Sequence, residues 1–269
     1  MTEKQQRIRN AIQDFCLMDD EFMTAFFDNN IECTEYVLRI ILDKPDLQVT
    51  AVHSQWNVTN LYGRSGRLDI KAVDNAGRFY DIEIQRADKG AGAKRARFNS
   101  ALLDTRFLQA GQSTEALPET YVIFITENDM LGLGKACYHI DRVVAESGEF
   151  FGDMAHIVYV NNAYRGDDTL GQLMHDFACC KAENMMSSLL ARYAKSTKLD
   201  TDKVVNMSYF MEELVKEERA EAQEEIQIDT AVKMLNEKMI SEERLAAFFD
   251  FTPEQVAKVI DLYNRQFSL

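Results

Sequence analysis

The chain has 269 residues, of which 46% are hydrophobic and 28% are charged, a composition typical of globular proteins that excludes wholesale disorder. Its 30 Lys and Arg residues against 44 Asp and Glu residues give a formal net charge of −14, and this average argues against a nucleic-acid partner. The five cysteines form no CxxC pair and no apolar run reaches the roughly 18 residues of a membrane span, so we expect a cytoplasmic protein with reduced thiols and no membrane partner.

The N-terminal half is predicted to consist of two helices followed by three strands. Apolar residues at helical spacing predict helices at residues 5–17 and 20–43. The second helix is expected to break near Asn29-Asn30 and to end before Pro45. Alternating and β-branched residues predict strands at residues 48–60, 66–73 and 78–85. The last two strands are joined by Asn75-Ala76-Gly77, a three-residue hairpin loop in which Gly77 takes the left-handed conformation.

The rest of the chain is predicted to form one more helix, then two strands, and then only helices. A helix is expected at residues 93–110, strands at residues 121–126 and 156–160, and helices from about residue 168 onward. Residues 212–225 contain seven Glu residues, and their only basic residues are Lys216 and Arg219, which predicts a solvated acidic helix. We therefore expect an α/β domain, an acidic helical linker and a small helical module, at residues 1–200, 201–228 and 229–269.

The hairpin loop fixes which residues lie opposite each other on its two strands. Its register places Ile70 opposite Ile82 on one face and Asp69 opposite Glu83 on the other, with Gln85 one step along the same face. Two directly opposed carboxylates destabilise a strand pair by up to about 1 kcal/mol. A divalent cation such as Mg²⁺ would remove this repulsion, and it would also activate water for hydrolysis. The alternative is that both carboxylates are exposed and are kept apart by water.

These residues, in this order, resemble the PD-(D/E)XK nuclease superfamily, and in particular its recombination-promoting nuclease and transposase branch, where Gln commonly replaces the Lys of the motif. The resemblance covers roughly residues 8–195. It is carried by Arg67-Leu-Asp69-Ile, Ile82-Glu-Ile-Gln85, Gly90–Ser100, Tyr121–Thr126, Ile157–Asn161 and Leu173–Phe177. It implies an α/β fold with a restriction-endonuclease-like core of helix, three-stranded meander, helix and strand, which the all-α C-terminal extension would follow.

The resemblance also implies roles for individual residues. Asp69 and Glu83 would bind Mg²⁺, for which Mn²⁺ could substitute, and the backbone carbonyl of Ile84 would be a further ligand. Gln85 would stand in the place of the motif's Lys and orient the attacking water. Some superfamily members add an acidic residue from the first core helix, and Glu35 is the corresponding residue here.

The charge is unevenly distributed along the chain, so the net charge of −14 does not exclude a nucleic-acid partner. Residues 64–106 contain ten basic and six acidic residues, so this segment is +4 and the remainder of the chain is −18. Lys94, Arg95 and Arg97 lie in the first turns of the helix beside the acidic pair, where backbone N–H groups also point outward, and we expect them to bind DNA phosphates. The alternative for these three residues is an ordinary solvated helix start.

We therefore predict a Mg²⁺-dependent DNA endonuclease that hydrolyses phosphodiester bonds and is associated with recombination or mobile elements. An RNase or a structure-specific nuclease would use the same chemistry. An alternative from another class is a non-enzymatic adaptor, which keeps the fold and acts through its acidic helices because Gln85 weakens the site. Thr252-Pro253 predicts a helix start in the C-terminal module, which would serve either as a helix-turn-helix for DNA or as a self-association surface in a homo-oligomer.

Overall fold

The chain divides into two compact units, residues 1–208 and residues 209–269. The computed structural model describes residues 12–58, 66–86, 90–108, 111–200, 203, 223 and 226–267, and it describes residues 56–58, 66–68 and 266–267 by their backbone alone. Most of the predicted acidic linker and of the predicted helix at residues 5–17 lies outside the described residues.

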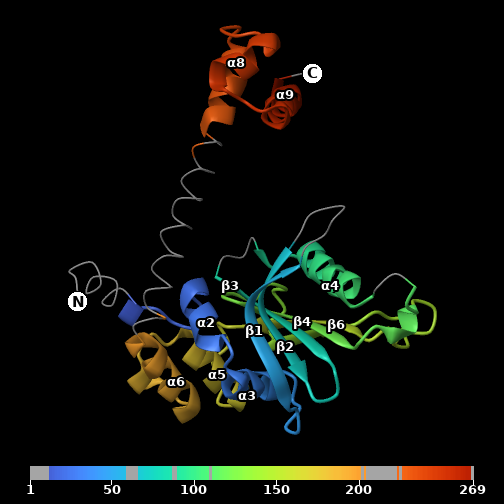
Figure 1. The fold of residues 1–269 in the computed structure, drawn as a ribbon, viewed down its shortest axis with the longest axis vertical. Helices are drawn as coiled ribbons and strands as arrows, with labels where there is room; N and C mark the ends of the chain where they lie inside the picture. The colour runs from blue at the N-terminus through green and yellow to red at the C-terminus, as the bar shows by residue number, and fades with distance from the viewer. Residues whose placement is uncertain are drawn as a thin grey trace. The chain divides into compact units, whose positions relative to one another are not determined.

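The first unit is built on a six-stranded mixed sheet with the strand order β1-β2-β3-β4-β6-β5 (Figure 1). Its strands are β1 (Val49–Val58), β2 (Gly66–Asp74), β3 (Phe79–Gln85), β4 (Thr120–Thr126), β5 (Cys137–Ile140) and β6 (Ala155–Asn161). Strands β1, β2 and β3 form an antiparallel meander, β3, β4 and β6 are parallel, and β5 adds an antiparallel edge. The sequence did not predict β5, because four half-exposed residues at a sheet edge leave too short an alternating pattern.

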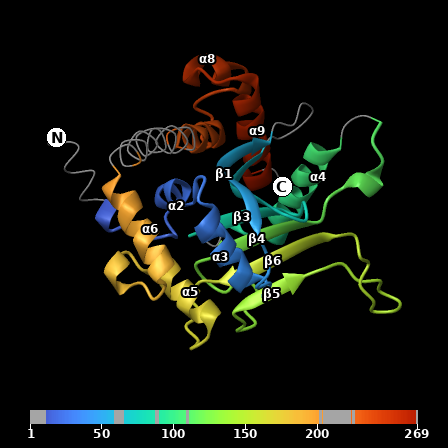
Figure 2. The same ribbon diagram turned by 60° about the horizontal axis from the view of Figure 1, so that its bottom comes forward.

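Helices cover both faces of this sheet (Figure 2). One face carries α2 (Asp20–Phe27), α3 (Ile31–Ile41), α5 (Thr169–Ala178) and α6 (Ser188–Leu199), the opposite face carries α4 (Ala93–Phe107), and η2 (Thr114–Ala116) and η3 (Ala182–Asn184) are short 3-10 turns. The predicted break between the first two helices is confirmed, since Asn29 has a φ of +55° and the side chain of Asn30 caps α3 by accepting the Cys33 N–H. Among the helices that the structure describes, none has both the length and the apolar character needed to cross a bilayer.

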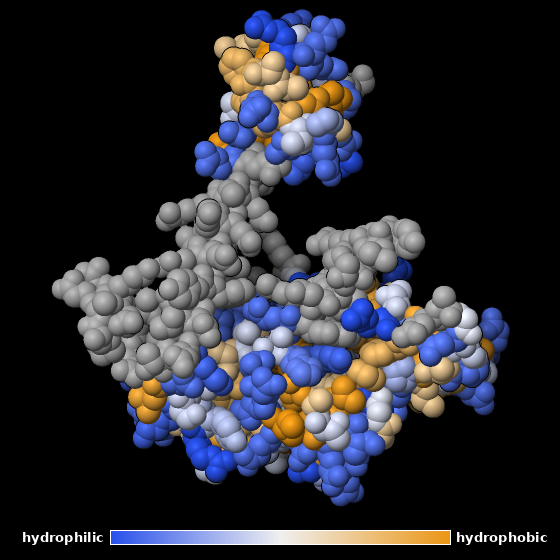
Figure 3. All heavy atoms as spheres, in the orientation of Figure 1, coloured by the Kyte–Doolittle hydropathy of each residue, from blue (hydrophilic) through white to orange (hydrophobic). Residues whose placement is uncertain are grey.

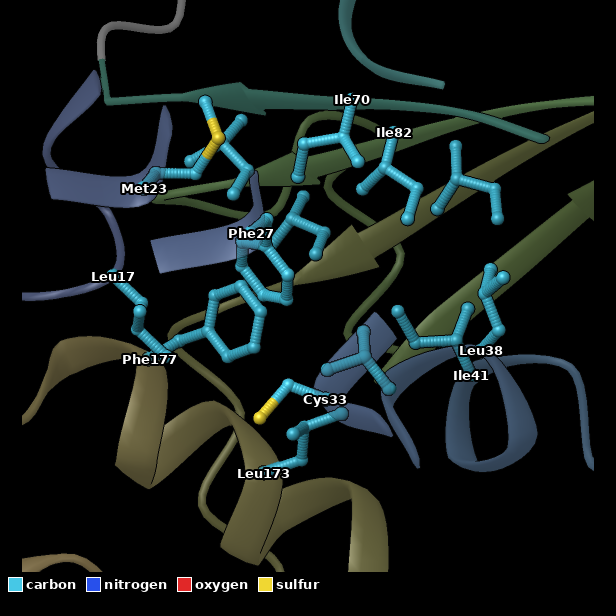
Figure 4. Packing of buried hydrophobic residues seen from close by; sticks show 14 of the residues in the cluster. Leu17, Met23, Phe27, Cys33, Leu38, Ile41, Ile70, Ile82, Leu173 and Phe177 are labelled. Carbon is cyan, nitrogen blue, oxygen red and sulfur yellow. The ribbon is translucent and has the colours of Figure 1, made fainter. Parts of the chain in front are cut away.

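The larger hydrophobic core lies between the sheet and the helices α2, α3 and α5 (Figure 4). The rings of Phe27 in α2 and Phe177 in α5 pack with their centroids 6.2 Å apart. Ile70 and Ile82, which pair across β2 and β3 as predicted, point into this core from the sheet (Figure 4). Burying alternate residues of the hairpin in this way directs the intervening ones, including the acidic pair, to the face that α4 covers.

The element order is that of a restriction-endonuclease-like core, as the sequence predicted: helices, the meander β1-β2-β3, helix α4 and the parallel strand β4. The hairpin loop is also as predicted. Asp74 and Arg78 close it through a backbone hydrogen bond of 3.1 Å, and Gly77 has a φ of +78°. The loop thereby fixes the register of β2 against β3, on which the position of the acidic pair depends.

Replacing Gly77 tests how strongly this loop sets the register. Gly77→Ala is expected to lower the free energy of unfolding by about 1–2 kcal/mol, since a Cβ atom is unfavourable at a positive φ. Urea denaturation measures the difference. Ala76→Ser, at an exposed position of the same loop, serves as the control and is expected to change stability by less than about 0.5 kcal/mol. Equal stabilities for the two variants would contradict the structural role of Gly77.

The second unit is helical, as predicted for the C-terminal extension. Residues 226–236 are helical, and they are followed by η4 (Glu242–Arg244), α8 (Leu245–Phe249) and α9 (Pro253–Phe267). Its core is formed by Ile228, Ala231, Val232, Leu235, Leu245, Phe251 and Val259. Thr252 caps α9 by accepting the N–H of Gln255, which confirms the predicted helix start at Pro253. Apolar residues also lie at the surface of this unit (Figure 3), and Phe248 is 60% exposed.

Candidate active site

The two carboxylates singled out by the sequence lie side by side on the face of the sheet that α4 covers. Continuing the register of the Ile70–Ile82 pair by one residue places Asp69 in β2 across from Glu83 in β3. Each carboxylate accepts a hydrogen bond from the opposite strand: the Ile84 N–H donates to Oδ2 of Asp69 at 3.2 Å, and the Asp69 N–H donates to Oε1 of Glu83 at 3.4 Å. The fold therefore brings the predicted pair together.

Arg95, in the first turn of α4, completes this cluster. Its Nη2 lies 2.8 Å from Oε2 of Glu83, and its Nη1 lies 3.3 Å from Oε1 of Gln85 and 3.2 Å from the carbonyl oxygen of Gly90. The sequence placed Arg95 only among the phosphate-binding residues, whereas the structure places it against the acidic pair. Lys94 and Arg97, the other two basic residues of this group, are exposed on α4.

Asp81 is a third carboxylate on the same face, and it is not among the site residues predicted from the sequence. It lies two residues before Glu83 and is completely buried. Its Oδ2 accepts a hydrogen bond of 3.3 Å from Nδ2 of Asn99 in α4, and its Oδ1 has no donor among the described residues. The signal was present in the sequence, because residues i and i+2 of a strand share a face and Asp81 therefore accompanies Glu83.

The environment raises the pKa of all three carboxyl groups. For Asp69, burial is the main cause, followed by the charges of Glu83 and of Asp20. Burial followed by the charges of Glu83 and Asp69 raises the pKa of Asp81, and the two carboxyls Asp81 and Glu83 lie within hydrogen-bonding reach of each other. Burial also raises the pKa of Glu83, although Arg95 opposes this shift. The cluster therefore holds more acidic groups than its one guanidinium balances.

The structure does not bring Glu35 to this cluster, which corrects its prediction as a metal ligand. Oε2 of Glu35 accepts the Val49 N–H at 2.9 Å, and its Oε1 forms an ion pair of 2.7 Å with Arg39. Val49 pairs with Asp74, at the opposite end of β2 from Asp69. Glu35 lies in α3, after the break that separates α3 from α2. The acidic residue whose charge acts on Asp69 is instead Asp20, in the first turn of α2.

A comparison with family models identifies the segment that holds this cluster. Residues 37–163 match the model of the PD-(D/E)XK nuclease family transposase. This segment is therefore similar to the PD-(D/E)XK nuclease family. It includes Asp69, Glu83, Gln85 and α4, and over residues 37–163 it confirms the resemblance stated from the sequence. No curated protein and no solved structure matches the chain.

The donor atoms of this nuclease-family site suit a divalent metal ion. Carboxylate and carbonyl oxygens are the ligands that Mg²⁺ prefers, and the buried Oδ1 of Asp81 is an acceptor without a donor among the described residues. Within the described ranges, no group of three or more His, Cys, Asp or Glu side chains is placed so that these side chains could hold a metal ion. A cation would therefore depend on Asp69, Glu83 and the Ile84 carbonyl, together with water and substrate phosphate.

Asp81→Asn is expected to stabilise the metal-free protein at pH 7 by about 1–3 kcal/mol. The amide keeps the acceptor for Asn99 and supplies a donor toward Glu83, so that an unsatisfied buried acceptor is removed. The free energy of unfolding, measured with urea in the presence of a chelator, gives the difference. Asp46→Asn at an exposed position is the control and should change it by less than about 0.5 kcal/mol. A clear loss of stability in Asp81→Asn would show that the Asp81 charge is balanced in the native state.

Proposed function

We propose that this chain is a metal-dependent DNA endonuclease that hydrolyses phosphodiester bonds and uses Mg²⁺, with Mn²⁺ as a substitute. The observation that supports this most strongly is the side-by-side arrangement of Asp69 and Glu83 within a segment that is similar to a nuclease family. The basic residues Lys94, Arg95 and Arg97 lie on the helix next to the pair, which favours a polyanionic substrate.

Different residues of the chain would bind the metal ion, orient the reacting groups and bind the flanking phosphates. Asp69, Glu83 and the carbonyl of Ile84 would hold the metal ion, which when bound polarises a phosphoryl oxygen and lowers the pKa of a coordinated water. Gln85 lies beside Glu83 and orients the reacting groups through its amide. Lys94 and Arg97 bind the phosphates on either side of the reacting one from the exposed face of α4.

The biological setting is part of the same proposal. The matching family model describes a transposase, which supports an enzyme that acts on DNA during recombination or in mobile elements. A cytoplasmic location is part of the same proposal. We assign self-association to the C-terminal unit, because apolar residues at its surface such as Phe248 favour a protein partner. Lys258 and Arg265 are the only basic residues of α9, which is less than a DNA-reading helix normally carries.

Cleavage of plasmid DNA tests the proposed activity. The purified full chain should nick supercoiled plasmid in the presence of Mg²⁺ or Mn²⁺, and a chelator should stop it. Asp69→Ala should reduce cleavage to background, whereas Glu35→Gln, which changes an acidic residue away from the cluster, should retain it. Equal cleavage by Asp69→Ala and the unmodified chain would overturn the assignment.

The second candidate is the non-enzymatic adaptor, which one observation favours. Arg95 forms an ion pair with Glu83, so a cation of the protein itself already neutralises part of the acidic pair. An adaptor would bind DNA or protein without cleavage, and its affinity for Mg²⁺ or Mn²⁺ would not depend on Glu83. The plasmid assay and a metal titration separate the two functions.

A further inference from the structure

The contacts of Arg95 distinguish it from the other basic residues of α4. In the part of the chain that the structure describes, Arg95 is the only basic residue that forms an ion pair with Asp69, Asp81 or Glu83. Its partner Glu83 is completely buried, whereas 41% of the Arg95 side chain is exposed. The guanidinium therefore lies at the mouth of the acidic cluster, between the buried carboxylates and the solvent from which a substrate approaches.

The hydrogen bonds of Arg95 use only part of its donor capacity. A guanidinium has five N–H donors, and three contacts are made: Nη2 to Glu83, and Nη1 to Gln85 and to the Gly90 carbonyl. The ring of Phe124, whose centroid is 6.0 Å from Cζ of Arg95, supports the guanidinium from the sheet. The group is thus held in place while some of its donors are left for an incoming phosphate.

Arg95 also sets the orientation of the Gln85 amide. Because Oε1 of Gln85 accepts from Arg95, the end of the amide that is left for a ligand is the N–H₂ donor. Gly90 makes this arrangement possible, since a Cβ atom there would lie 1.8 Å from Oε1 of Gln85. Gln85 and Arg95 therefore present donors on the same side of Glu83, and a phosphoryl oxygen is an acceptor that suits both.

We propose that Arg95 is a catalytic residue, which donates to a non-bridging oxygen of the scissile phosphate while it holds Gln85 with its N–H₂ group toward the same phosphate. Hydrolysis forms one bond between the water oxygen and phosphorus and breaks one phosphoester bond. The attacking water gives up one proton to the solvent, and the departing oxygen keeps the electron pair of the broken bond and takes a proton from solvent water. Negative charge that develops on the phosphoryl oxygens is stabilised by donors that are already fixed in position. This inference rests on the proposed nuclease function and adds the cation that Gln85 itself lacks.

Steady-state cleavage of plasmid and metal-free DNA binding test the proposal together. Arg95→Gln should lower kcat by about 100- to 1,000-fold, the range seen when one such donor is removed. The matched control is Arg97→Gln, two residues along α4, which should raise KM and reduce the salt dependence of DNA binding. Without metal, the affinity of Arg95→Gln for DNA should fall no further than the affinity of Arg97→Gln. Lys195→Gln, at an exposed position of α6, should leave all three quantities within about twofold.

The double variant Gln85→Lys/Arg95→Gln guards against a trivial loss of folding in Arg95→Gln, which deprives buried Glu83 of its counter-charge. A lysine in strand β3 restores a cation on the same side of Glu83. The kcat of the double variant should therefore be at least about tenfold higher than that of Arg95→Gln. An unchanged kcat in a folded Arg95→Gln variant, or a folded double variant without recovery, would overturn this inference alone. A wild-type chain that never cleaves DNA would overturn the proposed function and this inference together.

Discussion

Asp69→Asn is expected to lower plasmid cleavage at least about a thousandfold, which corresponds to about 4 kcal/mol of transition-state stabilisation. The same substitution should raise the free energy of unfolding of the metal-free protein by about 0.5–2 kcal/mol at pH 7.5. The cause is the same in both cases. A half-buried carboxylate beside Glu83 and near Asp20 destabilises the fold, and its charge is useful only when a cation is bound.

Glu83→Gln separates this explanation from a general effect of removing charge. It should lose as much activity as Asp69→Asn but gain less stability, because Glu83 already has Arg95 as a counter-ion at 2.8 Å and Asp69 has no ion pair among the described residues. Initial cleavage rates and urea denaturation with a chelator measure the two effects. An Asp69→Asn variant that is both inactive and less stable than the wild type would argue for a purely structural role of Asp69.

The stability of the metal-free protein is expected to fall as the pH rises above about 4, the range in which carboxyl groups of an unfolded chain titrate. Burial and neighbouring carboxylates raise the pKa of Asp69 and of Asp81 in the folded protein, and burial raises that of Glu83. Between the unfolded and the folded pKa, the folded state binds more protons than the unfolded one. The stabilisation that these groups provide is therefore complete below the unfolded pKa and is lost as the pH rises through the folded pKa.

Asp74 has the opposite effect on the pH dependence of stability, and it limits the gain in stability at acidic pH. Although burial opposes the shift, hydrogen bonds from Tyr80 and Arg78 lower the pKa of Asp74. Its contribution to stability is present above the unfolded pKa and is lost as the pH falls through the folded pKa. Denaturation midpoints at several pH values with a chelator should therefore decline toward neutral pH, and a double Asp69→Asn/Asp81→Asn variant should flatten the decline. A midpoint that rises steadily from pH 5 to pH 8 would contradict the assigned pKa directions.

The sequence could predict those parts of the site that depend on local chain geometry. The Asn75-Ala76-Gly77 loop and the alternation of the flanking residues were enough to derive the register, and hence the opposition of Asp69 and Glu83. Asp81 follows from the same alternation with Glu83, but it became a candidate only when the structure showed it buried with one oxygen lacking a donor among the described residues.

Other parts of the site depend on how elements that are distant in the sequence pack together. The contact of Arg95 with Glu83 requires the position of α4 on the sheet, which its own sequence does not contain. Glu35 was predicted from its place on an early helix, but the packing of α3 on the sheet brings it to Val49 at the start of β1, which pairs with Asp74 and not with Asp69. The acidic residue that influences Asp69 comes instead from α2, where Asp20 lies.

Calorimetric titration of the full chain with Mn²⁺ and Mg²⁺ measures whether Asp69 and Glu83 together hold a divalent cation. The wild-type chain and the Glu35→Gln control should bind the metal, with protons released from the cluster on binding. Asp69→Asn and Glu83→Gln should each abolish that binding while remaining folded. Metal binding that persists in both variants, or its absence from the wild-type chain, would contradict a cation site shared by Asp69 and Glu83.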